Sequence, residues 1–269
     1  MARSTKKVLA IADLHCGHKG GLTPPDWQLR STKASEGKHT KFAKLEQETW
    51  NWYCKTLDEI GPVDVTITLG DLIDGTGRRS GGTEQITTDM NVQTEIALEA
   101  LSQIDTDQIV MVSGTPYHVG DSTDFEEVLA SKLGGVKIGD HEWVDVNGVV
   151  FDCKHNVPDN SSIYGAGSAL SKERLFNAIW ATEGGQPRAD VLLRAHVHQF
   201  NYTGACHNGK PFVAMTLPCL QGSSRYGARM CSYHTDLGMV EFTVDGNGEW
   251  TWKAHVARLQ SASAKALVL

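Results

Sequence analysis

Residues 7–16 read KVLAIADLHC, and the prediction of the fold starts from this stretch. Its short, nearly continuous apolar run is typical of a buried strand. The run stops at Asp13, so Leu14 and His15 lie at the carboxyl end of the predicted strand. Because successive side chains of a strand point to opposite faces, Asp13 and His15 share a face. The stretch therefore predicts a buried strand that ends in two side chains able to bind a metal ion.

Strand and helix patterns alternate outward from this stretch through the first half of the chain. The period of the apolar residues predicts strands at 63–69 and 109–112, helices at 42–60 and 86–104, and a further helix that starts at a capping box of Thr123 and Glu126. This alternation implies a parallel sheet with right-handed crossovers, and hence an α/β fold.

The second half of the chain changes character. Asn147-Gly148 is a typical two-residue hairpin turn between two strand patterns. The predicted elements are strands at 143–146, 149–154, 191–194, 201–205 and 212–217, a helix at 169–181, and a last strand pair around 245–248. With no repeat and no linker, we expect one domain over residues 1–260 and a flexible Ala/Ser-rich tail at 261–269.

Composition and charge exclude several classes of protein. The 269 residues are 40% hydrophobic and 21% charged, as in an ordinary globular protein, and the net charge of −7 argues against nonspecific nucleic-acid binding. No apolar run is long enough for a signal peptide or a membrane span. The six cysteines form no CxxC pair, which favours reduced thiols over a zinc ribbon. We therefore expect a cytoplasmic protein without membrane contact, whose oligomeric state the sequence leaves open.

Residues that can bind a metal ion follow the predicted strands where each one ends. They are Asp13, His15, Asp71, His155, His196 and His198. Because open α/β folds place ligand sites at the carboxyl ends of their strands, these side chains can converge in space. Imidazoles combined with carboxylates suit Mn, Fe, Zn or Co better than Ca or Mg. The pattern therefore predicts a transition-metal site.

The remaining histidines and two cysteines have a simpler interpretation. For His18, His39, His141, His207, His234 and His255 we expect surface positions or hydrogen-bonded core positions. Cys16 follows the Asp13–His15 pair, and Cys153 shares a strand face with His155. Either cysteine could tune the site as a soft ligand, but a small buried side chain is the favoured interpretation.

The order of these motifs resembles the calcineurin-like metallophosphoesterase superfamily, particularly its small bacterial and phage members. The motifs are D-x-H, G-D-x-x-D, G-x...H, a lone His and H-x-H, which together span residues 13–198. The resemblance implies a sandwich of two mixed sheets flanked by helices. It also implies two divalent metal ions, Mn first, with Fe, Zn, Co or Ni as alternatives. One ion would be held by Asp13, His15 and His198, the other by His155 and His196, with Asp71 bridging both. Asp74, the second Asp of G-D-x-x-D, would order the ligands or the loop.

The chain departs from the family pattern at residues 114–118, which read GTPYH. The family usually has Gly-Asn-His here, with the Asn as a metal ligand and the His acting on the leaving group. Thr115 stands at the Asn position and either binds through its hydroxyl or leaves water in its place. Pro116 stands at the His position, and our hypothesis is that the Pro turn swings His118 back into the site. The alternative is that His118 is an ordinary loop residue.

This ligand set predicts phosphoester hydrolysis without a covalent enzyme intermediate. Two ions roughly 3.5–4 Å apart, bridged by Asp71, lower the pKa of a bridging water and clamp the phosphate oxygens. The resulting hydroxide attacks phosphorus, and His118 protonates the leaving alkoxide. Arg78 and Arg79 lie in a Gly/Ser-rich loop, where they either pair with phosphate oxygens or are solvated loop charges.

The substrate class is less constrained than the reaction. The loop 17–39 is Gly/Pro-rich and carries Trp27 and several basic residues, which would suit a nucleotide or a single strand. We expect a phosphodiesterase acting on nucleotides or related small esters. A DNA or RNA nuclease is the first alternative and a phosphomonoesterase the second. A non-catalytic metal-bound scaffold that binds a partner protein is the alternative from another class.

Overall fold

The computed structural model describes residues 4–29, 38–78, 80–120, 122–157, 166–207, 209–224, 227–228 and 234–259. The predicted tail at 261–269 and Arg79 lie outside the described residues. None of the helices in the described ranges is long and apolar enough to pass through a bilayer.

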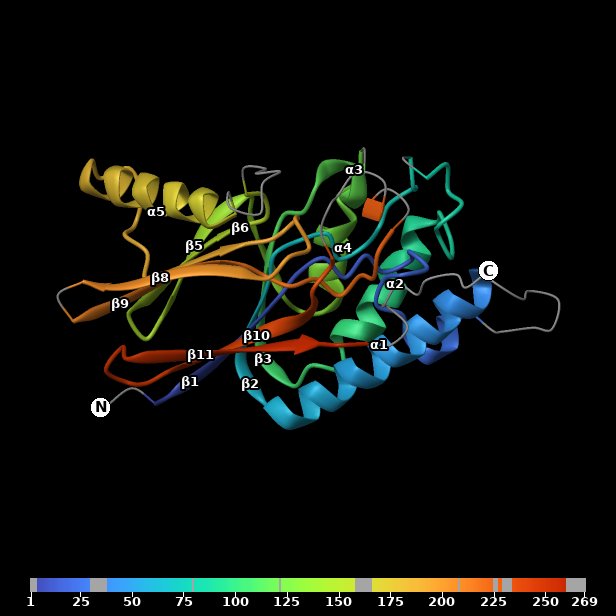
Figure 1. Cartoon of the computed structure of the whole chain (residues 1–269), viewed down its shortest axis with the longest axis horizontal. Coiled ribbons are helices and arrows are strands. Elements are labelled where there is room, and N and C mark those ends of the chain that lie inside the picture. Colours follow the sequence, from blue (N-terminus) through green and yellow to red (C-terminus); the bar gives the residue numbers. More distant parts are fainter. Residues whose placement is uncertain are drawn as a thin grey trace, which may run out of the picture.

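Two β-sheets form the centre of the molecule (Figure 1). The first has the order β11-β10-β1-β2-β3-β4, and the second has the order β5-β6-β7-β9-β8. The strands of the first sheet are β1 (Lys6–Ile11), β2 (Val63–Thr68), β3 (Thr106–Val112), β4 (Val136–Gly139), β10 (Leu237–Val244) and β11 (Trp250–Ala257). Those of the second are β5 (His141–Val146), β6 (Val149–Lys154), β7 (Val191–Arg194), β8 (Asn201–His207) and β9 (Lys210–Thr216).

Both sheets are mixed, as the family resemblance implies. The strands β1 to β4 pair in parallel, while β10 pairs antiparallel with β1 and β11 antiparallel with β10. In the second sheet β6, β7 and β9 run parallel to one another, and the edge strands β5 and β8 pair antiparallel with β6 and β9. The predicted α/β fold of two mixed sheets with flanking helices is confirmed.

Helices cover the outer face of each sheet (Figure 1). The helices are α1 (Lys38–Ile60), α2 (Met90–Leu101), α3 (Pro116–Val119), α4 (Phe125–Lys132) and α5 (Ala166–Thr182), with a 3-10 turn at Pro25–Trp27. Apolar side chains of α1, α2 and α4 pack on the first sheet, and α5 packs on the second. The result is a sandwich of four layers.

Strand β1 shows why the first sheet is buried on both faces. Its alternate residues Val8 and Ala10 belong to the core between the two sheets, whereas Leu9 and Ile11 belong to the core under the helices. Phe151 and Phe242 join the two sheets by an edge-to-face contact at 5.2 Å. A strand buried on both faces reads as a continuous apolar run, which is the pattern seen in the sequence.

The predicted capping box at Thr123 and Glu126 is wrong. Asp124 caps α4 instead, because its side chain accepts hydrogen bonds from the backbone N–H groups of Glu126 and Glu127. The Glu126 carboxylate points away from the cap and is fully buried. Helix α2 is also shorter than the predicted 86–104, because Asp89 caps it at its amino end.

The predicted hairpin at Asn147-Gly148 is confirmed. Val146 pairs with Val149 across the turn, and Asn147 and Gly148 have φ values of 53° and 91°. Positive φ at both central residues is what a tight hairpin turn requires. The sequence analysis did not predict strand β4 or the one-turn helix α3.

Candidate metal centre

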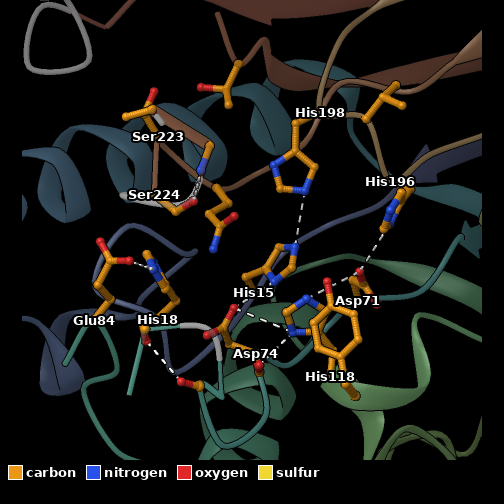
Figure 2. A pocket seen from close by; sticks show the side chains of 18 of the residues that line it. His15, His18, Asp71, Asp74, Glu84, His118, His196, His198, Ser223 and Ser224 are labelled. Atoms are coloured by element: carbon orange, nitrogen blue, oxygen red, sulfur yellow. Dashed lines mark hydrogen bonds and ion pairs between the residues drawn. The ribbon is translucent and has the colours of Figure 1, made fainter. Parts of the chain in front are cut away.

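The predicted metal ligands meet where strands of both sheets end. Figure 2 shows His15, Asp71, His196 and His198 among them. Asp13, His15 and Asp71 follow strands of the first sheet, and His155, His196 and His198 follow strands of the second. Side chains separated by up to 183 positions in the sequence therefore lie within hydrogen-bond distance, as His15 and His198 do.

The backbone is left-handed at most of these residues. Positive φ values occur at Asp13 (53°), His15 (45°), Asp71 (52°), His196 (73°) and His198 (55°). Among the other described non-glycine residues, only Asn147 of the hairpin turn has a positive φ. Such conformations are unfavourable for residues with a Cβ and gather at functional sites. The strain is therefore concentrated at the residues that the sequence singles out as ligands.

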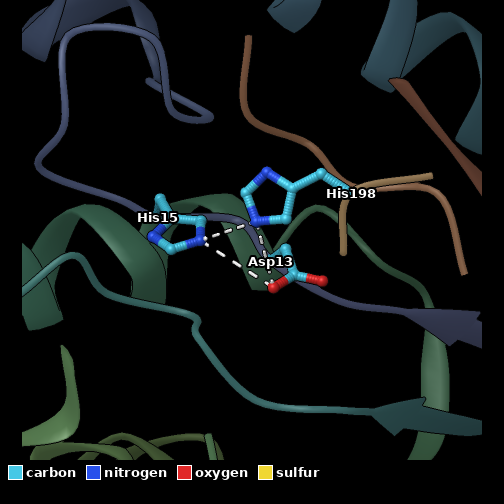
Figure 3. Close-up of side chains that lie close together, drawn as sticks. All are labelled: Asp13, His15 and His198. Carbon is cyan, nitrogen blue, oxygen red and sulfur yellow. Dashed lines mark hydrogen bonds and ion pairs between the residues drawn. The ribbon is translucent and has the colours of Figure 1, made fainter. Parts of the chain in front are cut away.

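One group of three donors consists of Asp13, His15 and His198 (Figure 3). The Oδ1 atom of Asp13 lies 3.3 Å from His198 Nε2 and 3.8 Å from His15 Nε2, and the two Nε2 atoms are 3.2 Å apart. This Oδ1 is buried and accepts no hydrogen bond from the described residues. A buried carboxylate oxygen without a partner is costly, and a cation between the three donors would satisfy it.

A second group consists of Asp71, His155 and His196. The Oδ2 atom of Asp71 lies 3.1 Å from His155 Nε2 and 4.0 Å from His196 Nδ1. Asp71 also belongs to a third group with His15 and His118, so it lies between the first and second groups. One carboxylate placed between two sets of imidazoles fits a pair of metal ions, as the resemblance implies.

Thr115 lies inside the second group. Its hydroxyl donates to Asp71 Oδ2 at 3.0 Å and is 3.2 Å from His155 Nε2 and 3.3 Å from His196 Nδ1. Its backbone N–H donates to Asp71 Oδ1. The hydroxyl thus lies among the donors of the second group, where a role in metal binding stays a prediction.

His118 returns to the site through helix α3. The Nδ1 atom lies 2.6 Å from the carbonyl oxygen of Asp74 and must donate to it, because a carbonyl only accepts. The opposite nitrogen, Nε2, faces Asp71 Oδ2 at 3.9 Å. Burial and the neighbouring His15 lower the pKa of His118 to about 4. The ring is therefore neutral near pH 7 and directs an unprotonated nitrogen toward Asp71.

Hydrogen bonds from the Nδ1 atoms orient the rings of His15 and His155. His15 Nδ1 donates to Asp74 Oδ1 at 2.8 Å, and Gln85 donates to the other Asp74 oxygen. His155 Nδ1 donates to the carbonyl oxygen of Leu69. Committing Nδ1 in this way leaves Nε2 free to bind a metal ion. Asp74 accordingly has the orienting position expected for it and is not one of the grouped donors.

Carboxylates and imidazoles shift each other's pKa strongly. Burial alone would lower the pKa of His15, but the neighbouring carboxylates of Asp13 and Asp74 raise it to about 9. Asp71 in the same way outweighs burial and raises the pKa of His155 to about 9. The histidines hold the pKa values of Asp13 and Asp71 well below the usual range, against the effect of burial. Buried carboxylates that stay ionised provide the negative charge that a bound cation needs.

Glu126 is a site residue that the sequence analysis missed. Its two carboxylate oxygens accept from the backbone N–H groups of Leu72 and Gly114, each at 3.0 Å. It thereby joins the loop that carries Asp71 to the loop that carries Thr115. Close approach of these loops also requires Gly114, because a Cβ there would lie 2.3 Å from the Asp71 nitrogen. The spacing of Glu126 from Thr123 pointed to a helix cap, so no local signal indicated this role.

A cavity of about 330 Å³ opens over the donors. The residues that line it beyond the donors include Arg78, Tyr117, Ser223, Ser224, His234 and Thr235. His18 also lines it, but its Nδ1 accepts from the Gly20 N–H, in keeping with the hydrogen-bonded position expected for this histidine. Of the two arginines predicted to bind phosphate, Arg78 is thus at the cavity and Arg79 lies outside the described residues.

Trp27, Cys16 and Cys153 are not among the grouped donors of the described residues. Trp27 packs against the core under the helices, its Nε1 donates to Glu99 at 2.9 Å, and it does not line the cavity. Trp27 is therefore not placed to stack on a base at this site. The thiols of Cys16 and Cys153 are buried and point to the carbonyl oxygens of Leu22 and Phe151. Neither cysteine belongs to a group of donors, and burial raises both thiol pKa values.

Three of the remaining histidines, His141, His234 and His255, can be compared with the surface or hydrogen-bonded core positions expected for them. His141 pairs with Asp152 at 2.9 Å and His255 lies 3.4 Å from Glu241, so both have polar partners away from the donors. His234, expected to be an ordinary residue, lines the cavity. The side chains of His39 and His207 lie outside the described residues.

Comparison with known proteins finds similarity in structure only. No family model matches the chain, and no curated protein matches it in sequence. An archaeal phosphodiesterase has 12% identity and a TM-score of 0.44 over 93% of this chain and 99% of its own. A metallophosphoesterase from Sphaerobacter thermophilus has 12% identity and a TM-score of 0.41 over 94% and 89%.

Vps29 from Chaetomium thermophilum has 11% identity and a TM-score of 0.44 over 93% of this chain and 97% of its own. These neighbours include phosphoesterases, the class that the motif order resembles. Because identities and TM-scores are this low, the chemistry has to be argued from the site residues.

Proposed function

We propose that this protein is a metal-dependent phosphodiesterase that hydrolyses nucleotides or related small diesters. The observation that carries the proposal is the sharing of Asp71 between two groups of Asp and His donors at one strand edge. The left-handed backbone at Asp13, His15 and Asp71 supports it, because a merely structural cluster has no need of that strain.

The donors would hold two divalent ions. Asp13, His15 and His198 would bind one, His155 and His196 the other, and Asp71 both. Bound there, such ions supply Lewis acidity toward phosphate oxygens and a hydroxide nucleophile near neutral pH. Thr115 fixes the orientation of Asp71 through its N–H and its hydroxyl. Manganese is the first metal to test, followed by Fe, Zn, Co and Ni.

His118 would serve the leaving group. Its Nδ1–H is held by the Asp74 carbonyl, so the ring presents Nε2 to the substrate side of Asp71. A phosphate dianion or diester that enters beside the ring favours its protonated form, since a nearby negative charge raises an imidazole pKa. His118 can then pass the Nε2 proton to the departing oxygen.

The volume of the cavity favours a small ester over a long nucleic acid as the substrate. Its volume of about 330 Å³ lies within the range of pockets that enclose small ligands. Arg78 at its rim supplies one positive charge for the non-bridging phosphate oxygens. Ser223, Ser224 and Thr235 offer hydroxyls to the remainder of the substrate.

The direct test combines metal content with turnover. Purified protein loaded with Mn, Co, Ni or Zn is analysed for bound metal and for hydrolysis of bis-p-nitrophenyl phosphate. We expect bound metal and turnover in the wild type, and loss of both in Asp71→Asn. Asp26→Asn, at an exposed residue outside the groups, is the matched control. Tight metal binding without turnover across all four metals favours the scaffold alternative, and absence of bound metal contradicts the proposal.

The substrate class is tested separately from the chemistry. A nuclease that bridges several phosphates loses affinity steeply as salt rises, whereas a small diester does not. We expect weak salt dependence with a small diester and faster hydrolysis of the diester than of p-nitrophenyl phosphate. Steep salt dependence on DNA or RNA favours the nuclease, and preference for the monoester favours a phosphomonoesterase.

A further inference from the structure

Helix α5 exposes an apolar stripe on the outside of the molecule. Leu175, Phe176, Ile179 and Trp180 are each between 43% and 57% exposed, and they follow helical spacing along one side. The opposite side of the helix packs on the rest of the protein. Leu170 is buried in the core against the second sheet, and the Asn177 side chain is hydrogen-bonded to the backbone of Pro187 and Ala189. Figure 1 shows α5 on the far side of the sandwich from α1.

The stripe holds most of the exposed large hydrophobic side chains of the described residues. Of the seven large hydrophobic side chains that are exposed in the described residues, four lie on these two turns of α5. Scattered exposed apolar residues need no explanation, but a contiguous group on one helix face marks an interaction site. The metal centre does not use this face, since none of the four side chains lines its cavity.

The order of residues along the stripe is symmetric. About a point between positions 177 and 178, Leu175 corresponds to Trp180, Phe176 to Ile179 and Lys172 to Glu183. Lys172 and Glu183 are both exposed. Lys172 precedes Leu175 and Phe176 by three and four positions, and Glu183 follows Trp180 and Ile179 by three and four, a spacing that places residues on the same side of a helix. A cation thus stands at one end of the apolar stripe and an anion at the other.

We propose that this face binds a second copy of the chain through antiparallel pairing of two α5 helices. A two-fold axis perpendicular to an antiparallel helix pair, placed at the point between positions 177 and 178, sets Leu175 of one copy opposite Trp180 of the other and Phe176 opposite Ile179. The apolar side chains then pack on one another in the centre, and Lys172 of each copy faces Glu183 of the other. The parallel arrangement instead sets Lys172 against Lys172, so charge complementarity selects the antiparallel one.

The area of the stripe determines how stable the proposed dimer is expected to be. A stable interface buries about 800 Å² on each partner, and four half-exposed side chains supply only part of that area. We therefore expect a dimer that forms reversibly as the protein concentration rises.

Sedimentation of the full chain from about 1 to about 200 µM tests the proposal. The wild type is expected to shift from the 29.3 kDa monomer toward twice that mass. Phe176→Glu places a charge in the centre of the stripe and is expected to raise the dissociation constant at least roughly 100-fold. Because Phe176 is half-exposed in the monomer, the variant should keep the thermal transition of the wild type.

Charge reversal tests the antiparallel geometry. Lys172→Glu and Glu183→Lys each create like charges across the interface and are expected to weaken the dimer about 3- to 10-fold. The double variant restores opposite charges and should recover the wild-type constant. Lys55→Glu, at an exposed position on α1, is the matched control and should change nothing.

A wild type that stays monomeric throughout the range overturns the proposal and leaves the face for a different partner. A dimer that Phe176→Glu does not weaken overturns it as well. Single reversals that the double variant fails to rescue exclude the antiparallel pairing.

Discussion

Five of the predicted ligands place a carboxylate or an imidazole on left-handed backbone, at Asp13, His15, Asp71, His196 and His198. Each such residue costs on the order of 1–2 kcal/mol relative to an ordinary conformation. The fold nevertheless holds them there, with backbone hydrogen bonds such as that from the Asp13 N–H to the Gly70 carbonyl. At the scale of single residues, the chain gives up stability to direct these side chains toward one centre.

His118 is the residue whose removal separates metal binding from chemistry. In His118→Asn we expect turnover to fall by about 10²- to 10⁴-fold, the range for loss of a general acid. Bound metal should stay unchanged, because the donors of the two ion sites remain in place. Steady-state hydrolysis and metal analysis on the same samples measure both. Wild-type turnover in the variant would remove His118 from the mechanism, and His141→Asn serves as the histidine control away from the donors.

Glu46 makes stability depend on pH. It is fully buried on α1, where one oxygen accepts from the Leu29 N–H and the other accepts nothing from the described residues. Burial raises the pKa of Glu46 to about 7. Between pH 4.5 and 7 the unfolded chain loses this proton while the folded chain keeps it, so stability falls as the pH rises through that window.

The matching variant is Glu46→Gln, which cannot ionise. Relative to this variant, the wild type should lose up to about 3 kcal/mol of unfolding free energy between pH 4.5 and pH 8. Urea unfolding of both proteins at several pH values measures the difference. Parallel stability curves for the two proteins would show that Glu46 does not titrate in this way.

At the scale of elements, helix α4 fastens two ligand loops together through Glu126. The carboxylate accepts one hydrogen bond from each loop, and a glutamine can accept only one of them, because its amide nitrogen would face a second N–H. We expect Glu126→Gln to weaken metal binding about 10- to 100-fold, the usual effect of losing a partner that orients metal ligands.

Calorimetric titration with Mn²⁺ and a thermal melt check this expectation for Glu126. The variant should also unfold at a lower temperature, because one buried N–H loses its acceptor at a cost of about 1–3 kcal/mol. Glu127→Gln is the matched control, since Glu127 is the exposed neighbour on the same helix. Equal metal affinity in the Glu126 variant and the control would show that the loops hold their positions without Glu126.

At the scale of the whole molecule, the sequence reveals the local elements better than their pairing. Strand ends with Asp and His are visible because a buried apolar run and a polar residue directly after it are local features, as at Asp13 and Asp71. The antiparallel pairing of β10 with β1 joins residues more than 200 positions apart, and no local pattern encodes it. The same limit explains Glu126, whose partners belong to two other loops.

The place of His118 was predicted only as a hypothesis, because a proline turn can direct the chain in several ways. The one-turn helix α3 and the bond from His118 to the Asp74 carbonyl decide its direction, and both depend on contacts with the loop after β2. The ligand types and the orienting role of Asp74 could thus be predicted from sequence, whereas the direction of His118 and the role of Glu126 required the structure.

The proposed function requires that two metal ions share Asp71 between donors from both sheets. Anomalous diffraction from crystals grown with Mn²⁺ tests this claim. We predict two peaks per chain, one among Asp13, His15 and His198 and one among His155, His196 and Thr115, with the Asp71 carboxylate between them. Crystals that show no peak beside Asp71, or that place His155 and His196 away from it, would contradict the claim.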